Sequence, residues 1–142
     1  MRATAANVTR EYLLVFDKGD DVGPTLLDFA KRDDIGAASF HAIGALRDAT
    51  IAYWNPTTLR YEEIPVAEQV EVVSMTGNLA PSVDGTKMHA HIVLGRRDGS
   101  TIAGHFVRGI VFPTLEVFLT AREMSVQRAK DDATGLWLLQ SF

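Results

Sequence analysis

The stretch "KMHAHIVLGRRDGSTIAGHFVRG", residues 87–109, contains two strand-like segments joined by turn-forming residues. Both segments are rich in β-branched and other apolar residues, a composition typical of strands. Asp98-Gly99 lies between them, and this dipeptide favours the left-handed backbone conformations of tight hairpin turns. We therefore expect an antiparallel hairpin whose turn is centred near residue 98.

The same stretch holds three of the four histidines of the chain. His89 and His91 are two residues apart, so on a strand they project from the same face. His91 lies seven residues before the turn centre and His105 seven residues after it, which places them opposite each other. Gly104 leaves room beside His105 for a close backbone approach or a bulge. The spacing predicts that three imidazoles converge.

Three imidazoles with an open fourth position form a ligand set for a divalent metal such as zinc, which can also hold water or a small anion. The same spacing also fits half-buried strand histidines that hydrogen-bond to neighbours, or exposed ones. His41, in "SFHAIG", is interpreted as an ordinary strand residue rather than a further ligand.

Most of the remaining chain also shows short segments rich in Val, Ile, Thr and aromatic residues, separated by turn residues. The pattern predicts a mostly antiparallel sheet of about seven strands, preceded by the short apolar run "REYLLVF". The seven segments are "AASFHAIGAL", "DATIAYWN", "LRYEEIPV", "EQVEVVSMTGNLA", "HAHIVLGR", "STIAGHFVRGIV" and "TLEVFLTA".

One main helix is predicted near the N-terminus. Asp21 or Gly23 can cap it, Pro24 stands near the first helical position, and Gly36 can take the left-handed closing position. Its apolar stripe consists of Leu26, Leu27 and Ala30. One early helix followed by many strands indicates an α+β domain.

Length and composition indicate one folded domain spanning residues 1–142, because the sequence has no repeat, linker or low-complexity segment. Cysteine is absent from the sequence, which excludes disulfides and thiolate metal sites. Any metal must therefore be bound by histidine and carboxylate side chains.

The net charge is −4, and lysine and arginine are scattered along the sequence. A protein that binds duplex DNA by itself usually has a basic stripe that displaces counterions, and this sequence shows none. No apolar run is long enough for a signal peptide or approaches the roughly 18 residues of a membrane span. We expect a cytoplasmic protein.

Two further groups are candidates for a site. Glu116 shares a strand face with Thr114 and could orient a histidine or act as a general base toward metal-bound water. The alternative is a solvent-facing carboxylate. Arg47, next to Asp48, could bind an anion or form a surface ion pair with its neighbour.

Several motifs, taken in order, resemble the plants-and-prokaryotes-conserved (PPC) domain. These are "AIGALRDATIAYWNP", "EVVSMTGNLAP", "HAHIVLGRRDGSTIAGHFVRGIVFPTLEVFLT" and "RAKDDATGLWLL". The resemblance runs from about Glu11 to Leu139. In plants this domain accompanies AT-hook motifs in nuclear proteins, and in bacteria and archaea it stands alone. The resemblance implies an α+β fold around an antiparallel sheet, and a homotrimer.

The family pattern H-x-H...G-H matches His89, His91, Gly104 and His105, and family members hold a zinc-like metal with such histidines. The resemblance therefore implies a metal at these residues. Other positions match the family without an assigned chemistry, and Asn78 and Thr114 among them are candidates for a pocket. They are Gly44, Leu46, Gly77, Asn78, Gly109, Thr114 and Glu116.

The sequence departs from the plant branch of the family in two ways. It lacks the Arg-Gly-Arg-Pro element of the AT-hook, which enters the DNA minor groove. At "AEQVEVVSMTG" it lacks the Gly-Arg-Phe-Glu-Ile-Leu stretch that plant members use for partner contact.

Three hypotheses about function follow. The first is a homotrimer that binds a divalent metal, with a small molecule or an anion as a further ligand at the metal. The second is a DNA-binding, transcription-associated module, as in the plant relatives. The third is a metal-dependent hydrolase or lyase in which Glu116 carries the proton. A DNA-binding surface would draw on Arg47, Arg96, Arg97, Arg108 or Arg122.

Overall fold

The structure is a computed structural model, and it describes residues 7–141. These residues form one helix and eight strands. In chain order the elements are β1 (Asn7–Phe16), α1 (Val22–Arg32), β2 (Ala37–Asn55), β3 (Arg60–Val66), β4 (Val70–Ala80), β5 (Lys87–Gly95), β6 (Thr101–Glu123), β7 (Val126–Lys130) and β8 (Trp137–Ser141).

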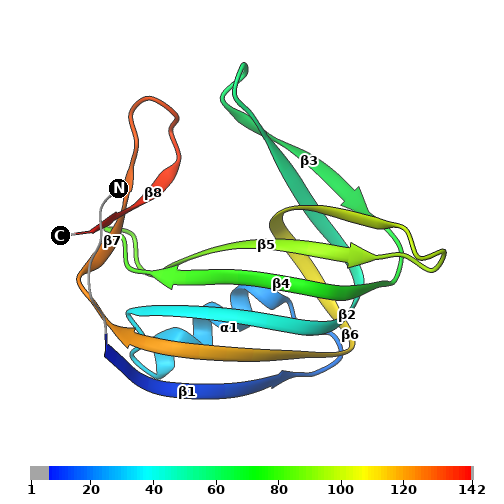
Figure 1. Cartoon of the computed structure of the whole chain (residues 1–142), viewed down its shortest axis with the longest axis horizontal. Helices are drawn as coiled ribbons and strands as arrows, with labels where there is room; N and C mark the ends of the chain where they lie inside the picture. Colours follow the sequence, from blue (N-terminus) through cyan, green and yellow to red (C-terminus); the bar gives the residue numbers. More distant parts are fainter. Residues whose placement is uncertain (1–6, 142) are drawn as a thin grey trace.

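Six of the strands form one antiparallel sheet in the order β1-β6-β5-β4-β2-β3, and β6 also pairs with β2. The extra pairing closes β2, β4, β5 and β6 on themselves, so the sheet is strongly curved. A separate small sheet, β7 with β8, forms the C-terminal hairpin. In Figure 1 this hairpin and the β2–β3 end both project from the same side of the sheet. The predicted α+β fold is confirmed.

The long strands differ from the prediction. β2 includes both "AASFHAIGAL" and "DATIAYWN", and β6 runs through Pro113 to include two predicted segments. At Gly44 the β2 backbone has φ +149°, and a Cβ there would collide with the backbone oxygen of Thr114. The register shifts on both sides of Gly44, so the strand bends at a bulge there, and it continues past Arg47, where the predicted segments were separated.

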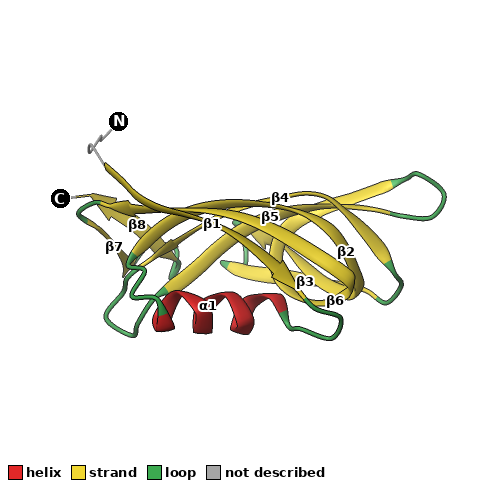
Figure 2. Ribbon diagram, turned by 90° about the horizontal axis from the view of Figure 1, so that it is seen from below, coloured by secondary structure: helices red, strands yellow, loops and turns green. Residues whose placement is uncertain are grey.

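Helix α1 covers one face of the sheet (Figure 2). Leu26 and Ala30 are buried, so the predicted apolar stripe does face the core. Asp21 is the N-cap residue, although its side chain makes no capping hydrogen bond. The expectation for Gly36 was wrong: Asp34 takes the left-handed conformation after the helix, at φ +52°. Aspartate tolerates this conformation better than most side chains.

The core lies between the curved sheet and α1, and twelve large side chains in it are almost completely inaccessible to solvent. Hydrophobic burial on this scale is the main stabilising term for a domain of this size. These side chains are Leu26, Leu46, Ile51, Met75, Leu79, Ile92, Leu94, Leu115, Leu119, Val22, Val70 and Val111. α1 has 11 residues, and no described helix is long and apolar enough to cross a membrane.

Candidate metal centre

The β5–β6 hairpin has the predicted turn. Gly99 has φ +84°, its amide donates to the Arg96 carbonyl at 2.9 Å, and the Arg96 amide donates to the Ser100 carbonyl at 2.8 Å. Asp98 closes the turn by accepting a hydrogen bond from the Ser100 amide at 2.9 Å. As a result His91 and His105 are direct Cα partners across the two strands.

The three histidines converge. Their ring centroids are 5.1 Å apart for His89 and His91, 5.2 Å for His89 and His105, and 5.7 Å for His91 and His105. One nitrogen from each ring lies within 4.8 Å of the corresponding nitrogens of the other two. We call these residues the three-histidine cluster. They project away from Ala90, which points into the core.

Close backbone packing positions two of these rings. A Cβ on Gly104 would come within 2.9 Å of the Ala52 carbonyl oxygen, so glycine lets β6 approach β2 next to His105. A Cβ on Gly77 would meet the His89 carbonyl oxygen at 2.6 Å and the Phe40 ring at 2.5 Å. Both glycines therefore fill places where no side chain fits.

The three histidines can bind a cation only when their imidazole rings are uncharged. Burial lowers the pKa of His105 to about 4, helped by repulsion from His89, His91 and Arg128. Burial also lowers the pKa of His89, with smaller effects from Arg128 and His91. Both rings are then uncharged at neutral pH, and the neutral imidazole is the form that binds metals.

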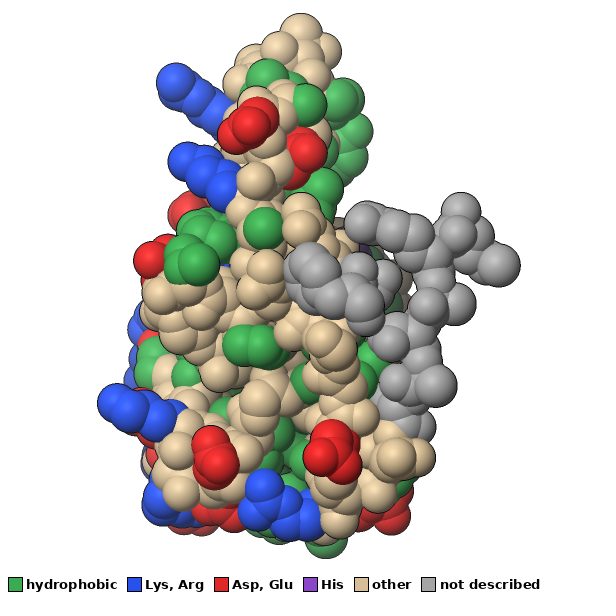
Figure 3. Space-filling model, turned by 90° about the vertical axis from the view of Figure 1, so that its left-hand side faces the viewer, with side chains coloured by type: hydrophobic (Ala, Val, Ile, Leu, Met, Phe, Trp, Pro, Cys, Tyr) green, Lys and Arg blue, Asp and Glu red, His purple; other side chains and the backbone are tan. Residues whose placement is uncertain are grey.

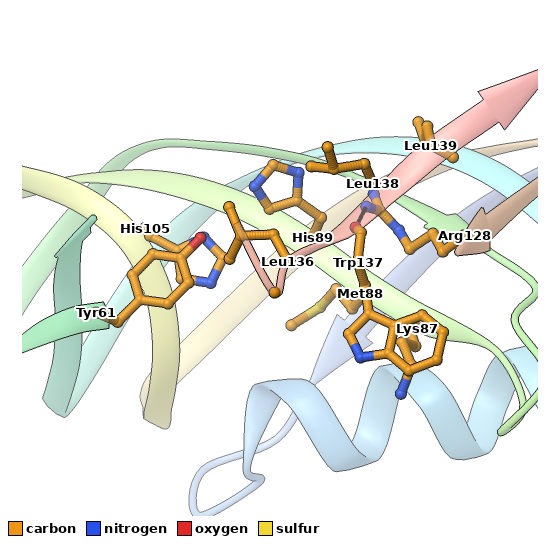
Figure 4. Close-up of a pocket in the computed structure, with 11 residues that line it drawn as sticks. Tyr61, Lys87, Met88, His89, His105, Arg128, Leu136, Trp137, Leu138 and Leu139 are labelled. Atoms are coloured by element: carbon orange, nitrogen blue, oxygen red, sulfur yellow. Dashed lines mark hydrogen bonds between the residues drawn. The ribbon is translucent and has the colours of Figure 1, made fainter. Parts of the chain in front are cut away.

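A cavity of about 440 Å³ adjoins the cluster. Figure 4 shows Tyr61 beside His105 at one end, Arg128 and Trp137 at the other, and His89 between them. The remaining lining is mostly apolar and comes from the C-terminal hairpin, including its turn, and from the start of β5. The full set is Tyr61, Lys87, Met88, His89, His105, Arg128, Gly135, Leu136, Trp137, Leu138 and Leu139.

No sequence pattern indicated that Arg128 or Tyr61 belongs to the site. Arg128 is buried, with 6 % of its surface exposed. Its guanidinium donates to Asn78 Oδ1 at 2.5 Å and to the Trp137 carbonyl at 2.7 Å. Tyr61 stacks on His105 with ring centroids 4.4 Å apart. The available signal for this region was the apolar segment Leu136–Leu139 near the end of the sequence, which must pack against other residues.

The structure brings only one of the other predicted residues to the cluster. Asn78 is the Cα partner of His89 and holds Arg128. Thr114 instead donates a hydrogen bond to the Phe16 carbonyl at 3.1 Å. Glu116 pairs with Val15 and Ile43, on β1 and β2, and neither it nor Thr114 lines the cavity.

Arg47 and His41 also lie apart from the cluster. Arg47 is exposed and forms an ion pair with Asp48 at 2.7 Å. His41 stacks on Phe118, with ring centroids 5.1 Å apart and an angle of 4° between the planes. The interpretation of His41 as a residue outside the cluster agrees with this placement.

The fold and the site together define an α+β protein with a curved antiparallel sheet and a three-histidine cluster on two neighbouring strands. The model of the Plants and Prokaryotes Conserved (PCC) domain matches residues 3–123. The chain belongs to this family, as the motifs in its sequence indicated. No curated protein matches it.

Solved structures support the family and the fold. A metal-containing protein from Archaeoglobus fulgidus is 31 % identical, with a TM-score of 0.92, and the match covers 99 % of this chain and 100 % of that one. A plant- and prokaryote-conserved protein from Pyrococcus horikoshii is 28 % identical, with a TM-score of 0.93 and coverage of 100 % and 99 %. A protein from Bacteroides thetaiotaomicron, whose description proposes DNA binding, is 25 % identical, with a TM-score of 0.88 and coverage of 95 % and 96 %.

Proposed function

We propose that this protein is a standalone, cytoplasmic, homotrimeric PPC-domain protein that binds a divalent metal, zinc or a similar ion, through His89, His91 and His105. The convergence of three imidazole nitrogens within 4.8 Å is the observation that carries the proposal. The 31 % identical protein from Archaeoglobus fulgidus, which contains a metal, supports it.

The residues fit the ion. Zinc–nitrogen bonds of about 2.1 Å in tetrahedral geometry separate two ligand nitrogens by about 3.4 Å, so small side-chain rotations close the cluster around the ion. His105 Nδ1 is buried without a hydrogen-bond partner among the described residues. A buried nitrogen without a partner is costly, and a metal bond or a hydrogen bond tied to metal binding would satisfy it.

The homotrimer draws support from an exposed apolar patch on β1, β2 and β6, formed by Leu13, Val15, Ile43 and Phe118. Between 42 % and 62 % of each of these side chains is exposed. Leu13 is the Cα partner of Phe118, so the side chains share one face of the sheet. Exposed apolar side chains gathered on one face are typical of protein interfaces, and here they surround Glu116, the Cα partner of both Val15 and Ile43.

Elemental analysis of untagged protein by plasma mass spectrometry tests the metal. We expect close to one zinc or similar divalent ion per chain. The variant with His89→Ala, His91→Ala and His105→Ala should lose it. His41→Ala is the matched control, because His41 is the fourth histidine and lies outside the cluster, and it should retain the ion. Protein that lacks a metal, and takes up none from added zinc, would contradict the proposal.

DNA binding is less well supported by the surface. Basic and acidic side chains are interspersed on the described part of the face in Figure 3. Three of the five arginines considered for a DNA-binding surface contact carboxylates, which reduces their attraction for phosphate. These contacts are Arg47 with Asp48, Arg96 with Glu68, and Arg108 with Asp21 and Asp48.

A metal-dependent hydrolase or lyase is compatible with the cavity beside His89 and His105. A zinc ion bound by three neutral ligands lowers the pKa of bound water and can polarise a substrate oxygen. Glu116 would not serve as the proton carrier from its position between Val15 and Ile43. Tyr61, which stacks on His105, is the nearer proton-bearing group.

A further inference from the structure

Arg128 is a buried cation without a counterion. The guanidinium has five N–H donors, and two acceptors account for part of them: Asn78 Oδ1 and the Trp137 carbonyl. Nε is buried and has no partner. Among the described residues, no carboxylate forms a salt bridge with Arg128. Burying an unpaired charge is costly, so the site is incomplete without an anion.

The charged side chains that line the rest of the cavity are positive, like Arg128. None of the described residues that line it is acidic. Lys87 also lines it, and its ammonium lies 4.6 Å from the Trp137 ring centroid. Its ion pair with Asp84 is long, at 3.9 Å, and Asp84 does not line the cavity. A divalent ion bound by three neutral imidazoles would keep its full double charge. The cavity would then hold at least three positive charges, from the ion and Arg128, with no protein anion in contact.

The walls of the cavity limit which anion fits. Leu136, Leu138 and Met88, together with the Trp137 ring, give the cavity an apolar surface beside the charged groups. A volume of about 440 Å³ lies within the range of small-molecule sites. A fully hydrated inorganic anion would leave this apolar surface uncovered, whereas an anion with an apolar substituent would cover it.

We infer that the cavity binds a small carboxylate with an apolar substituent, whose anionic group lies between Arg128 and the metal of the three-histidine cluster. Arg128 has the planar donor arrangement that matches a carboxylate. Asn78 and the Trp137 carbonyl fix its guanidinium in place before a ligand arrives. This inference rests on the proposed function for the metal, and it adds the chemical class of the ligand.

Calorimetric titration of zinc-loaded full-length protein tests the inference with hexanoate as the probe. We expect hexanoate to bind about tenfold or more tightly than 1-hexanol, which has the same tail without the charge, and than acetate, which has the charge without the tail. Equal affinity for hexanoate and 1-hexanol would overturn the inference. Tighter binding of inorganic phosphate than of hexanoate would overturn the assignment to a carboxylate.

Two variants locate the effect. Arg128→Gln should weaken hexanoate binding by about tenfold or more and leave the metal content unchanged. Arg122→Gln is the matched control, because Arg122 also donates to a polar side chain, Ser39 Oγ at 3.1 Å, but lies outside the cavity. Hexanoate affinity that is unchanged in Arg128→Gln would overturn the inference. The comparison of probes on the parent protein stands even where Arg128→Gln does not fold.

Metal content measured in the same samples separates the two proposals. Protein without metal that still binds hexanoate through Arg128 would contradict the metal site and support the anion subsite. Metal-loaded protein that does not bind hexanoate would support the metal site and overturn the inference.

Discussion

At the scale of single residues, His105 is the side chain on which most of the site's properties depend. It is a Cα partner of His91 on one side and of Ala52 on the other, and Tyr61 stacks on its ring. This enclosure explains why its pKa is lowered to about 4. A ring that stays neutral keeps a nitrogen lone pair available for a metal over the whole physiological pH range.

The lowered pKa of His105 predicts how the stability of metal-free protein depends on pH. The unfolded chain takes up a proton near the usual histidine pKa of 6.5, whereas folded His105 takes it up only near about 4. The free energy of unfolding should therefore fall as the pH drops through this window and level off below it. Urea denaturation between pH 7.5 and 4, with a chelator present, measures this slope.

Replacing His105 checks the origin of the pH dependence. His105→Gln should make the slope between pH 6.5 and 4 shallower than in the parent protein, because it removes the group with the pKa shift. His41→Gln, which alters an exposed histidine outside the cluster, should leave the slope as it is. An equal slope in the parent protein and His105→Gln would show that His105 is not the source.

The sequence predicted the histidines well and the rest of the site poorly, for a physical reason. His89, His91 and His105 are related by strand alternation and one short hairpin turn, so local rules place them. Arg128 reaches the site through contacts with Asn78 and Trp137, and the contact with Asn78 spans 50 positions in the sequence. Local patterns do not encode contacts of that range.

At the scale of secondary-structure elements, two hairpins contribute different parts of the site. The β5–β6 hairpin contributes all three histidines, and the C-terminal hairpin contributes Arg128 and most of the apolar cavity wall. The period-two pattern predicted most of the strands. It did not predict that β2 and β6 are continuous, because the predicted segments stop at Leu46 and Val111, whereas long-range pairing carries both strands past Arg47 and Pro113.

A substitution in the C-terminal hairpin should affect ligand binding without affecting metal binding. Gly135 has φ +73° in the turn between β7 and β8, a conformation that valine strongly disfavours. Gly135→Val should destabilise the hairpin by about 1–3 kcal/mol and speed hydrogen exchange of its amides. Hexanoate binding should weaken, and the metal content should stay unchanged.

The contrasting variant is Gly99→Val, which creates the same kind of strain at φ +84° in the β5–β6 turn. It should speed hydrogen exchange around the histidines and lower the metal affinity. If Gly135→Val reduced the metal content as much as Gly99→Val, the two hairpins would not act separately.

At the scale of the whole molecule, the apolar patch of Leu13, Val15, Ile43 and Phe118 predicts self-association. A homotrimer would have three times the chain mass of 15.6 kDa in light-scattering measurements. Leu13→Asp places a charge where 58 % of the leucine is exposed, next to Phe118, and should shift the protein to monomers if the patch is the interface.

Val83→Asp is the control for this measurement, because Val83 is 85 % exposed in the loop before β5 and outside the patch. It should leave the mass unchanged. A parent protein that is monomeric would contradict the homotrimer, and a Leu13→Asp variant with the full trimer mass would place the interface elsewhere.

The position of Arg128 in a small sheet of its own also bears on how this family can diversify. The family model matches residues 3–123, and the C-terminal hairpin, which begins at Val126, lies beyond that match although its "RAKDDATGLWLL" segment also resembles the family. If the proposed metal site and anion subsite are both correct, a relative with a different hairpin would keep the three-histidine cluster and accept a different molecule. A chimera that carries another member's hairpin on this body is therefore a direct route to altered ligand selectivity.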